Sequence, residues 1–307
     1  MAINRASIAK ELLPGLNAVF GIEYGSVDEE HKPLYEIENS DRAFEEEVLF
    51  TGFGAAPVKG EGAAVVYDDA SESYTSRYTN ETVALAFAVT EEAMEDNLYD
   101  TFAKLRAKGL ARAMGSTKQQ KAADLYNNGF TTNQGDGVPM FSAAHPVVGA
   151  GTVTNITTAA AIAEGTIEAA IIQIQKTTDD RGILIGATGV SLHVPTDLMF
   201  TADVLLNTPG TTAGILGTAN HFANNDINAI RHLGVLPDGF YVNRRFTDVN
   251  AWFIKTDVPN GTKMFNRTPL QTKMEPDFDT GNLRFKARER YSFGVSDWRS
   301  WFGNQGA

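Results

Sequence analysis

The sequence predicts an α+β protein with an elongated body, and three observations indicate this class. Residues 90–129 have the pattern of one long helix, while a long strand begins at Leu283. Between them lies a block in which shorter helix and strand patterns alternate. A helix of roughly 55–60 Å beside a strand of about 40 Å makes a thin, extended molecule.

The first part of the chain predicts an arm and a protruding loop. Within residues 1–46, Ile8–Phe20 has apolar residues at helix spacing, interrupted by Pro14, and an acidic extended linker follows. Residues 47–89 show no helix pattern and predict a long two-stranded extended loop with its bend at Asp68–Ser73. An isolated hairpin of this size is marginally stable in water, so we expect a neighbouring subunit to support it.

The predicted helix at 90–129 has charges sorted along its length. Thr90 is a suitable N-cap and Gly129 a suitable stop. Acidic residues fill the first turns and basic residues the later ones, which suits the helix dipole and also suits head-to-tail contact with a second copy. We expect the buried stripe to consist of Met94, Leu98, Phe102, Leu105, Gly109 and Ala113.

The remaining elements form a mixed domain and a closing pair of strands. The patterns predict a helix at 161–176, a buried strand at 183–194, a short helix from Pro195 to about 206, and apolar alternation at 227–235 and 252–255. In the final strand the odd positions from Leu283 are mostly apolar. The even positions are basic: Arg284, Lys286, Arg288 and Arg290.

Composition argues against several classes of function. The chain has 307 residues and a formal net charge of −12, which disfavours tight binding to nucleic acid and leaves room only for weak, local contact. It has no cysteine, which excludes thiolate chemistry, and no apolar stretch long enough to cross a membrane. The five histidines are scattered without ligand spacing, and the glycines match no nucleotide loop. We therefore expect no catalytic residue, cofactor or metal.

The basic face of the last strand is the clearest interaction signal. Four like charges at alternate positions repel one another unless they meet acid from another segment or subunit, or face DNA. Protection of a sheet edge by charge is a third explanation. We favour protein–protein contact.

Five sequence blocks, in order and at matching spacing, resemble the major capsid proteins of tailed bacteriophages, particularly the Mu-like major head subunit group. These blocks are AFAVTEEAMEDNLYDTF, KAADLYNNGF, DGVPMFSAAHP, VSLHVPTDLMFTADVLL and RERYSFGVSDWRSWFG.

The resemblance implies the capsid fold that tailed phages share with herpesviruses. The implied divisions are an N-terminal arm (1–46), an extended loop (47–89), an axial domain (145–261) and a peripheral domain (90–144 and 262–307). The peripheral domain would hold the spine helix (90–129) and the closing strands (270–303). The implied function is structural, as a major head protein that self-assembles into the icosahedral shell around a double-stranded DNA genome, and it is not enzymatic.

The resemblance also implies partners and an interface. The expected partners are copies of the chain in pentamers and hexamers, a separate scaffold protein, a portal, a decoration protein and, weakly and without sequence preference, the packaged DNA; no membrane is involved. The expected location is the virion capsid, after assembly in the host cytoplasm. The expected interface residues are Phe50, Phe53, Lys59, Arg77, Glu95, Arg106, Arg112, Arg284, Arg288 and Arg290. The alternative is a soluble α/β enzyme or ligand-binding protein with a site in the middle domain.

Overall fold

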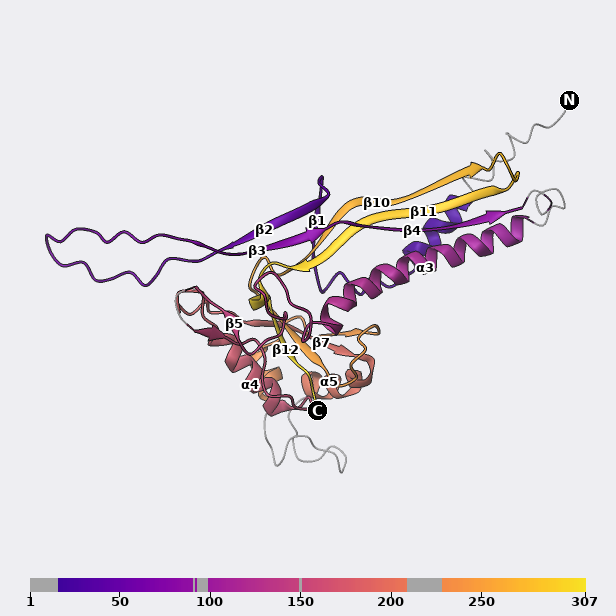
Figure 1. Ribbon diagram of the computed structural model, residues 1–307. Coiled ribbons are helices and arrows are strands. Elements are labelled where there is room, and N and C mark those ends of the chain that lie inside the picture. The colour runs from indigo at the N-terminus through magenta and orange to yellow at the C-terminus, as the bar shows by residue number, and fades with distance from the viewer. Residues whose placement is uncertain (1–15, 91, 93–98, 149–150, 209–227) are drawn as a thin grey trace, which may run out of the picture.

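A long, thin slab, a compact body and a protruding hairpin make up the molecule (Figure 1). This computed structural model describes residues 16–90, 92, 99–148, 151–208 and 228–307. One expected interface residue, Glu95, and most of the acidic start of the long helix lie outside the described residues.

The slab is built on a four-stranded sheet in the order β1-β10-β11-β4. Its strands are β1 (Glu36–Asn39), β4 (Glu81–Val89), β10 (Thr262–Pro276) and β11 (Leu283–Val295). β10 and β11 form a long antiparallel hairpin, β4 runs antiparallel to β11, and β1 runs parallel to the first residues of β10. The first closing strand, expected from residue 270, therefore begins eight residues earlier, at Thr262.

The alternating pattern of β11 is confirmed over its first half. Leu283, Phe285 and Ala287 are buried, whereas the intervening basic side chains are exposed. The next inward position departs from the pattern, because Glu289 is only 2 % exposed and places a carboxylate beneath the sheet.

The long helix α3 (Tyr99–Asn127) covers one face of this sheet and contacts β4 and β11 (Figure 1). The expected apolar stripe is wrong among the described residues: Leu105 is 65 % exposed and Gly109 is exposed. The buried face consists mainly of alanines, namely Ala103, Ala107, Ala111, Ala122 and Ala123. Small side chains let the helix lie close to the sheet, and because they contrast weakly with polar residues, the periodicity did not indicate this face.

A second helix, described over residues 16–25, lies on the same side of the sheet as α3. Leu16 and Phe20 are buried, and the Phe20 ring lies 6.1 Å from that of Phe285. The Asn17 side chain accepts a 2.8 Å hydrogen bond from Thr272 in β10. The expected helix at Ile8–Phe20 thus extends beyond Phe20, and its first residues lie outside the described ones.

The protruding hairpin consists of β2 (Phe44–Phe50), β3 (Glu72–Thr79) and the irregular residues 51–71 between them. We call residues 44–79 the extended hairpin. The expected bend at Asp68–Ser73 is wrong: the turn lies at residues 60–63, closed by the Ala63 amide on the Gly60 carbonyl, where two glycines flank Glu61. Nor is β4 part of the loop, because Val83, Phe87 and Val89 pack over the helices beneath the long sheet.

The compact body holds a second sheet in the order β12-β9-β7-β8. Its strands are β7 (Gly189–Pro195), β8 (Phe240–Asn243), β9 (Trp252–Thr256) and β12 (Trp301–Asn304). Around them lie α4 (Glu164–Gln175), η1 (Thr196–Leu198), α5 (Met199–Asn207), α6 (Ala229–Leu233), η2 (Trp298–Ser300) and the short pair β5 (His145–Pro146) and β6 (Thr152–Val153). The helices expected at 161–176 and after Pro195 are confirmed, and Ile167, Ile171, Leu192, Trp252 and Ile254 form the centre of the core.

Three expectations for this body are corrected. Apolar alternation at 227–235 belongs to α6, which starts at the Asn228 cap and ends at Gly234 with φ +60°. The strand expected from 183 begins at Gly189, and the preceding residues form an exposed hairpin. β12, assigned to the closing strands of the slab, pairs with β9 instead, because Trp301 and Phe302 are buried in the compact body and at its junction with the slab.

Candidate assembly surfaces

The described interface candidates lie on three separate surfaces. Phe50, Phe53, Lys59 and Arg77 lie on the extended hairpin. A second group lies on β11 and a third on α3, so the structure does not bring the candidates together into one site (Figure 1).

The outer part of the extended hairpin exposes apolar side chains. Phe50 is 64 % and Phe53 62 % exposed, and the prediction missed stronger cases, Val58 at 100 % and Tyr67 at 95 %. The signal in the sequence was the apolar run Ala63–Tyr67 in a segment without strand or helix pattern. Exposed apolar surface of this kind is typical of regions that contact another molecule.

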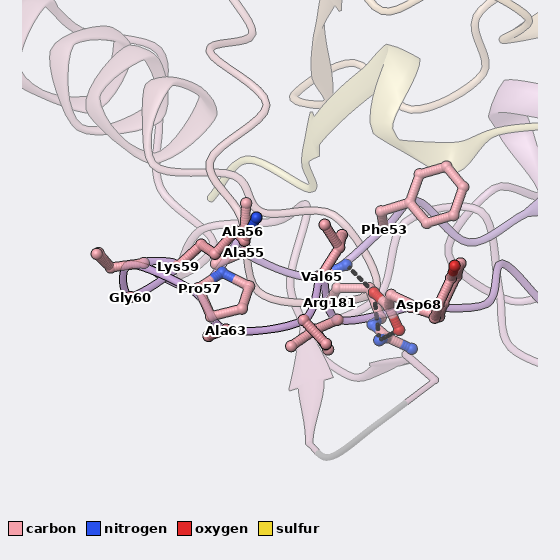
Figure 2. Close-up of a pocket in the computed structure, with 15 residues that line it drawn as sticks. Phe53, Ala55, Ala56, Pro57, Lys59, Gly60, Ala63, Val65, Asp68 and Arg181 are labelled. Carbon is pink, nitrogen blue, oxygen red and sulfur yellow. Dashed lines mark hydrogen bonds and ion pairs between the residues drawn. The ribbon is translucent and has the colours of Figure 1, made fainter.

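The two limbs of the hairpin enclose an open hollow of about 780 Å³, lined mostly by alanine, valine and glycine (Figure 2). Its volume would admit a small ligand. Its charged groups, however, include Asp68 and Arg181, which bind each other and do not converge on the space. The hollow therefore offers no set of polar groups that would fix a substrate.

Arg181 of the compact body binds the extended hairpin at Asp68. Its Nη2 lies 2.7 Å and 3.0 Å from the two carboxylate oxygens of Asp68 (Figure 2). Asp68 also accepts a 2.7 Å hydrogen bond from the Gly54 amide. The Gly54 bond first, and then Arg181, lower the pKa of Asp68.

A buried ionic cluster supports the turn that carries Arg181. The Arg299 guanidinium pairs with Asp180, lies 3.4 Å from Asp297, and donates a 3.3 Å bond to the Thr178 carbonyl. All three charged residues are buried. Burial raises the pKa of Asp297, while Arg299 acts in the opposite direction.

The root of the extended hairpin, formed by β2 and β3, is fixed to the long sheet. Lys263 Nζ lies 2.6 Å from Glu47 and 2.9 Å from Glu38. Burial lowers the pKa of Lys263, but the two carboxylates outweigh it and raise the value overall. Tyr74 donates a 2.8 Å bond to the Ser296 carbonyl, and Tyr78 shares a hydrogen bond with the Ser296 hydroxyl. The hairpin is thus held at its root while its outer limbs remain uncovered.

The second surface is the face of the long sheet opposite the helices. Arg288 and Lys286 are exposed there, beside Ala84 and Ala86 of β4. Arg284 pairs with Asp277 in the β10–β11 turn, so this predicted interface residue already has a partner in its own chain. The small alanines leave the basic side chains accessible from the β4 side.

The remaining candidates differ in their surroundings. Arg106 is exposed on α3, whereas Arg112 pairs with Glu23 of the N-terminal helix. On the hairpin, the Arg77 guanidinium lies over the Phe44 ring, and its Nε is 3.8 Å from Oε1 of Glu46. These internal contacts reduce the charge that Arg112 and Arg77 present to another molecule.

One pair in the compact body has the composition of a catalytic dyad but not its accessibility. His145 Nδ1 lies 2.6 Å from Asp136, and the His145 ring stacks on Trp298 at 3.9 Å. Both side chains are almost completely buried, so no substrate reaches them. His193 is also buried; burial first, and then Lys255, lower its pKa to about 3.

The described residues contain neither a candidate metal site nor a candidate membrane-spanning helix. Within the described ranges, no three or more His, Asp or Glu residues gather in a way that could hold a metal ion. Among the described helices, none is both long and apolar enough to cross a membrane.

Comparisons with known proteins agree on one class. A family model described as phage capsid protein matches residues 72–304, most of the chain. No curated protein sequence matches.

Among solved structures, the procapsid of bacteriophage JBD30 is 14 % identical with a TM-score of 0.54, covering 98 % of this chain and 76 % of that one. The capsid of an empty GTA particle is 15 % identical (TM-score 0.53, coverage 90 % and 89 %), and a virus-like particle from Pyrococcus furiosus 8 % (TM-score 0.52, coverage 95 % and 98 %). At these identities the structures establish the fold, which is the one expected.

Proposed function

Because the chain belongs to the phage capsid protein family and is a structural major capsid protein, we propose that its copies assemble through pentamers and hexamers into an icosahedral shell around the double-stranded DNA genome of a tailed phage. The observation that carries this proposal is the extended hairpin, anchored at its root and uncovered along its limbs. Exposed apolar limbs are unfavourable in a lone monomer and favourable once a second copy covers them.

Charge indicates where the hairpin of one copy docks. Its exposed acidic residues include Glu61, Asp69 and Glu72. The open face of the long sheet carries Lys286 and Arg288. We assign this face of a neighbouring copy as the receiving surface, because opposite charges direct two such surfaces together and set their register.

Further partners are proposed from the resemblance to phage capsid proteins. The exposed basic residues of α3, such as Arg106, would give weak contact with packaged DNA, and the net charge of −12 keeps that contact weak. A separate scaffold protein, a portal and a decoration protein remain proposed partners, with assembly in the host cytoplasm and residence in the virion. A non-enzymatic role and membership of the Mu-like subgroup also remain proposals.

Electron microscopy with size-exclusion chromatography tests the proposal. The test variant replaces residues 55–66 with a short Gly-Ser turn and keeps β3, since Tyr78 is 2 % exposed and belongs to the fold. A matched control exchanges Thr117, on the exposed side of α3, for Ser. We expect shells or five- and six-membered rings from the wild type and the control, and folded subunits without shells from the loop variant. Normal shells from the loop variant would contradict the proposal, as would a wild type that stays monomeric under all conditions.

A further inference from the structure

The N-terminal segment 16–35 crosses the helical side of the slab in two parts that are held differently. The inner part, 31–35, is firmly bound: the His31 amide donates 2.9 Å to Gln119, Tyr35 donates 2.6 Å to the Ala122 carbonyl, and Leu34 is 1 % exposed. The outer part is the helix at 16–25, which we call the strap. The strap ends at Gly25, whose surroundings are open.

The strap makes its buried polar contact with Glu289. Tyr24 donates a 3.1 Å hydrogen bond to Oε2 of this carboxylate. The cation that faces it, Lys118, is 3.8 Å away. The other oxygen, Oε1, is buried without a hydrogen-bond partner among the described residues, as is the nearby Tyr291 hydroxyl.

We propose that the strap is a proton-linked clasp: it docks firmly when Glu289 carries a proton and loosens when that carboxylate ionises. An ionised carboxylate needs several hydrogen bonds to offset its removal from water. Glu289 has one, from Tyr24, and its counter-charge lies beyond hydrogen-bond distance. Undocking the strap would remove the cover that Tyr24 provides and return the carboxylate to water.

The direction in which docking depends on pH follows from the surroundings of Glu289. Burial raises its pKa, and Lys118 and then Tyr24 offset this only in part. The pKa in the docked state is therefore higher than in the undocked state. Docking is fully favoured below the pKa of the undocked state and weakens as pH rises through the pKa of the docked state.

Other titratable groups around Glu289 do not account for the same response. Burial first, and then Lys118, lower the pKa of His31, so a proton that it takes up as the pH falls weakens the bound state, which is opposite to the response expected from Glu289. Burial raises the pKa of Tyr24, which is therefore neutral throughout this range. On β4, Glu81 pairs with Lys121 of α3 at an exposed position. Glu23 of the strap, whose side chain is 12 % exposed, pairs with Arg112 of α3 and so adds a second polar contact between the strap and the slab. Glu29 and Lys32 form a surface pair within the segment, which contributes little to docking.

Hydrogen exchange on the full-length subunit between pH 5 and pH 8 tests the clasp. The readout is protection of residues 16–25, corrected for intrinsic exchange and divided by protection of residues 31–35. Because one proton is linked to docking, we expect the wild-type ratio to fall with rising pH by up to about tenfold per pH unit between the two pKa values. Glu289→Gln should give a flat profile and stronger protection at pH 8.

Two further variants keep the test decisive. Glu81→Gln, the matched control at an exposed carboxylate, should follow the wild type. Tyr24→Phe retains the ring and removes the donor to the ionised carboxylate, so its protection should fall more at pH 8 than at pH 5. A flat wild-type profile, an unchanged slope in Glu289→Gln, a slope lost in Glu81→Gln, or an equal effect of Tyr24→Phe at both pH values would overturn the proposal.

Discussion

Replacing Arg299 by alanine should strongly destabilise the subunit. The guanidinium is buried between Asp180 and Asp297 and also binds the Thr178 carbonyl. Its removal leaves two buried carboxylates without their cation and a carbonyl without a donor. Removing one partner of such a cluster costs about 3–5 kcal/mol, a large part of the 5–15 kcal/mol typical of a whole domain.

The loss should depend on pH in a defined direction. Burial raises the pKa of Asp297 and Arg299 opposes this, so removal of Arg299 should raise that pKa further above its value in the unfolded chain. The destabilisation is therefore largest above the raised pKa of Asp297 and shrinks as pH falls through it. Urea unfolding at pH 7 and pH 5, followed by tryptophan fluorescence, measures both effects, since Trp298 lies 4.5 Å from the guanidinium.

Two comparison variants sharpen the result. Arg299→Met keeps much of the volume but not the charge, so it should lose nearly as much stability as alanine at pH 7. Adding Asp180→Asn to Arg299→Met removes one of the orphaned charges and should recover part of the loss. A loss below about 1 kcal/mol, or one that is equal at both pH values, would refute the electrostatic explanation.

Three other predictions concern the hairpin, the basic face and their support. Gly294→Ala should lower stability by about 1–3 kcal/mol in thermal melting, because its new Cβ would lie 2.6 Å from the Tyr78 ring; Gly60→Ala, with no atom within 4 Å, is the neutral control. Phe53→Ser should leave stability within about 0.5 kcal/mol and reduce shell yield in sedimentation, and an equal loss of both would assign Phe53 to the fold. Arg288→Glu should impair shell formation while the monomer melts normally, and an undiminished shell yield would exclude this face from assembly.

The fold was predictable where one pattern dominates a long segment. β11 shows this best: alternating apolar and basic side chains gave its start, its exposed face and its buried face. The exception is Glu289, since burial of a carboxylate depends on Tyr24 and Lys118, which come from distant parts of the chain. The alanine-lined face of α3 escaped prediction because small side chains leave a weak periodic signal.

The sequence indicated which kinds of residue lie on the candidate surfaces, but not how those residues pair with one another. The exposed Phe50 and Phe53 were identified, but Arg112 and Arg284 turned out to be paired with Glu23 and Asp277 in their own chain. The pairing of Arg112 with Glu23 joins residues 89 positions apart and depends on the tertiary fold, whereas Arg284 and Asp277 lie seven positions apart, on either side of the β10–β11 turn. The bend of the hairpin was misplaced because the polar stretch at 68–73 resembles a turn, while the Gly60–Ala63 turn resembles a flexible loop.

Three covalent connections join the slab and the compact body: one from α3 to β5, one from β9 to β10, and one from β11 through η2 to β12. The last two lie side by side. Hydrogen bonds link these two connections to each other: the Ser296 amide to the Gly261 carbonyl at 2.9 Å, the Trp301 indole to Thr262 at 2.9 Å, and Thr256 to the Arg299 carbonyl at 2.8 Å. Two connections that are hydrogen-bonded side by side resist twisting more than a single connection would. They still permit bending about an axis that crosses both of them. We therefore expect the junction to bend more easily than it twists. A load applied to the slab reaches the compact body through the peptide backbone.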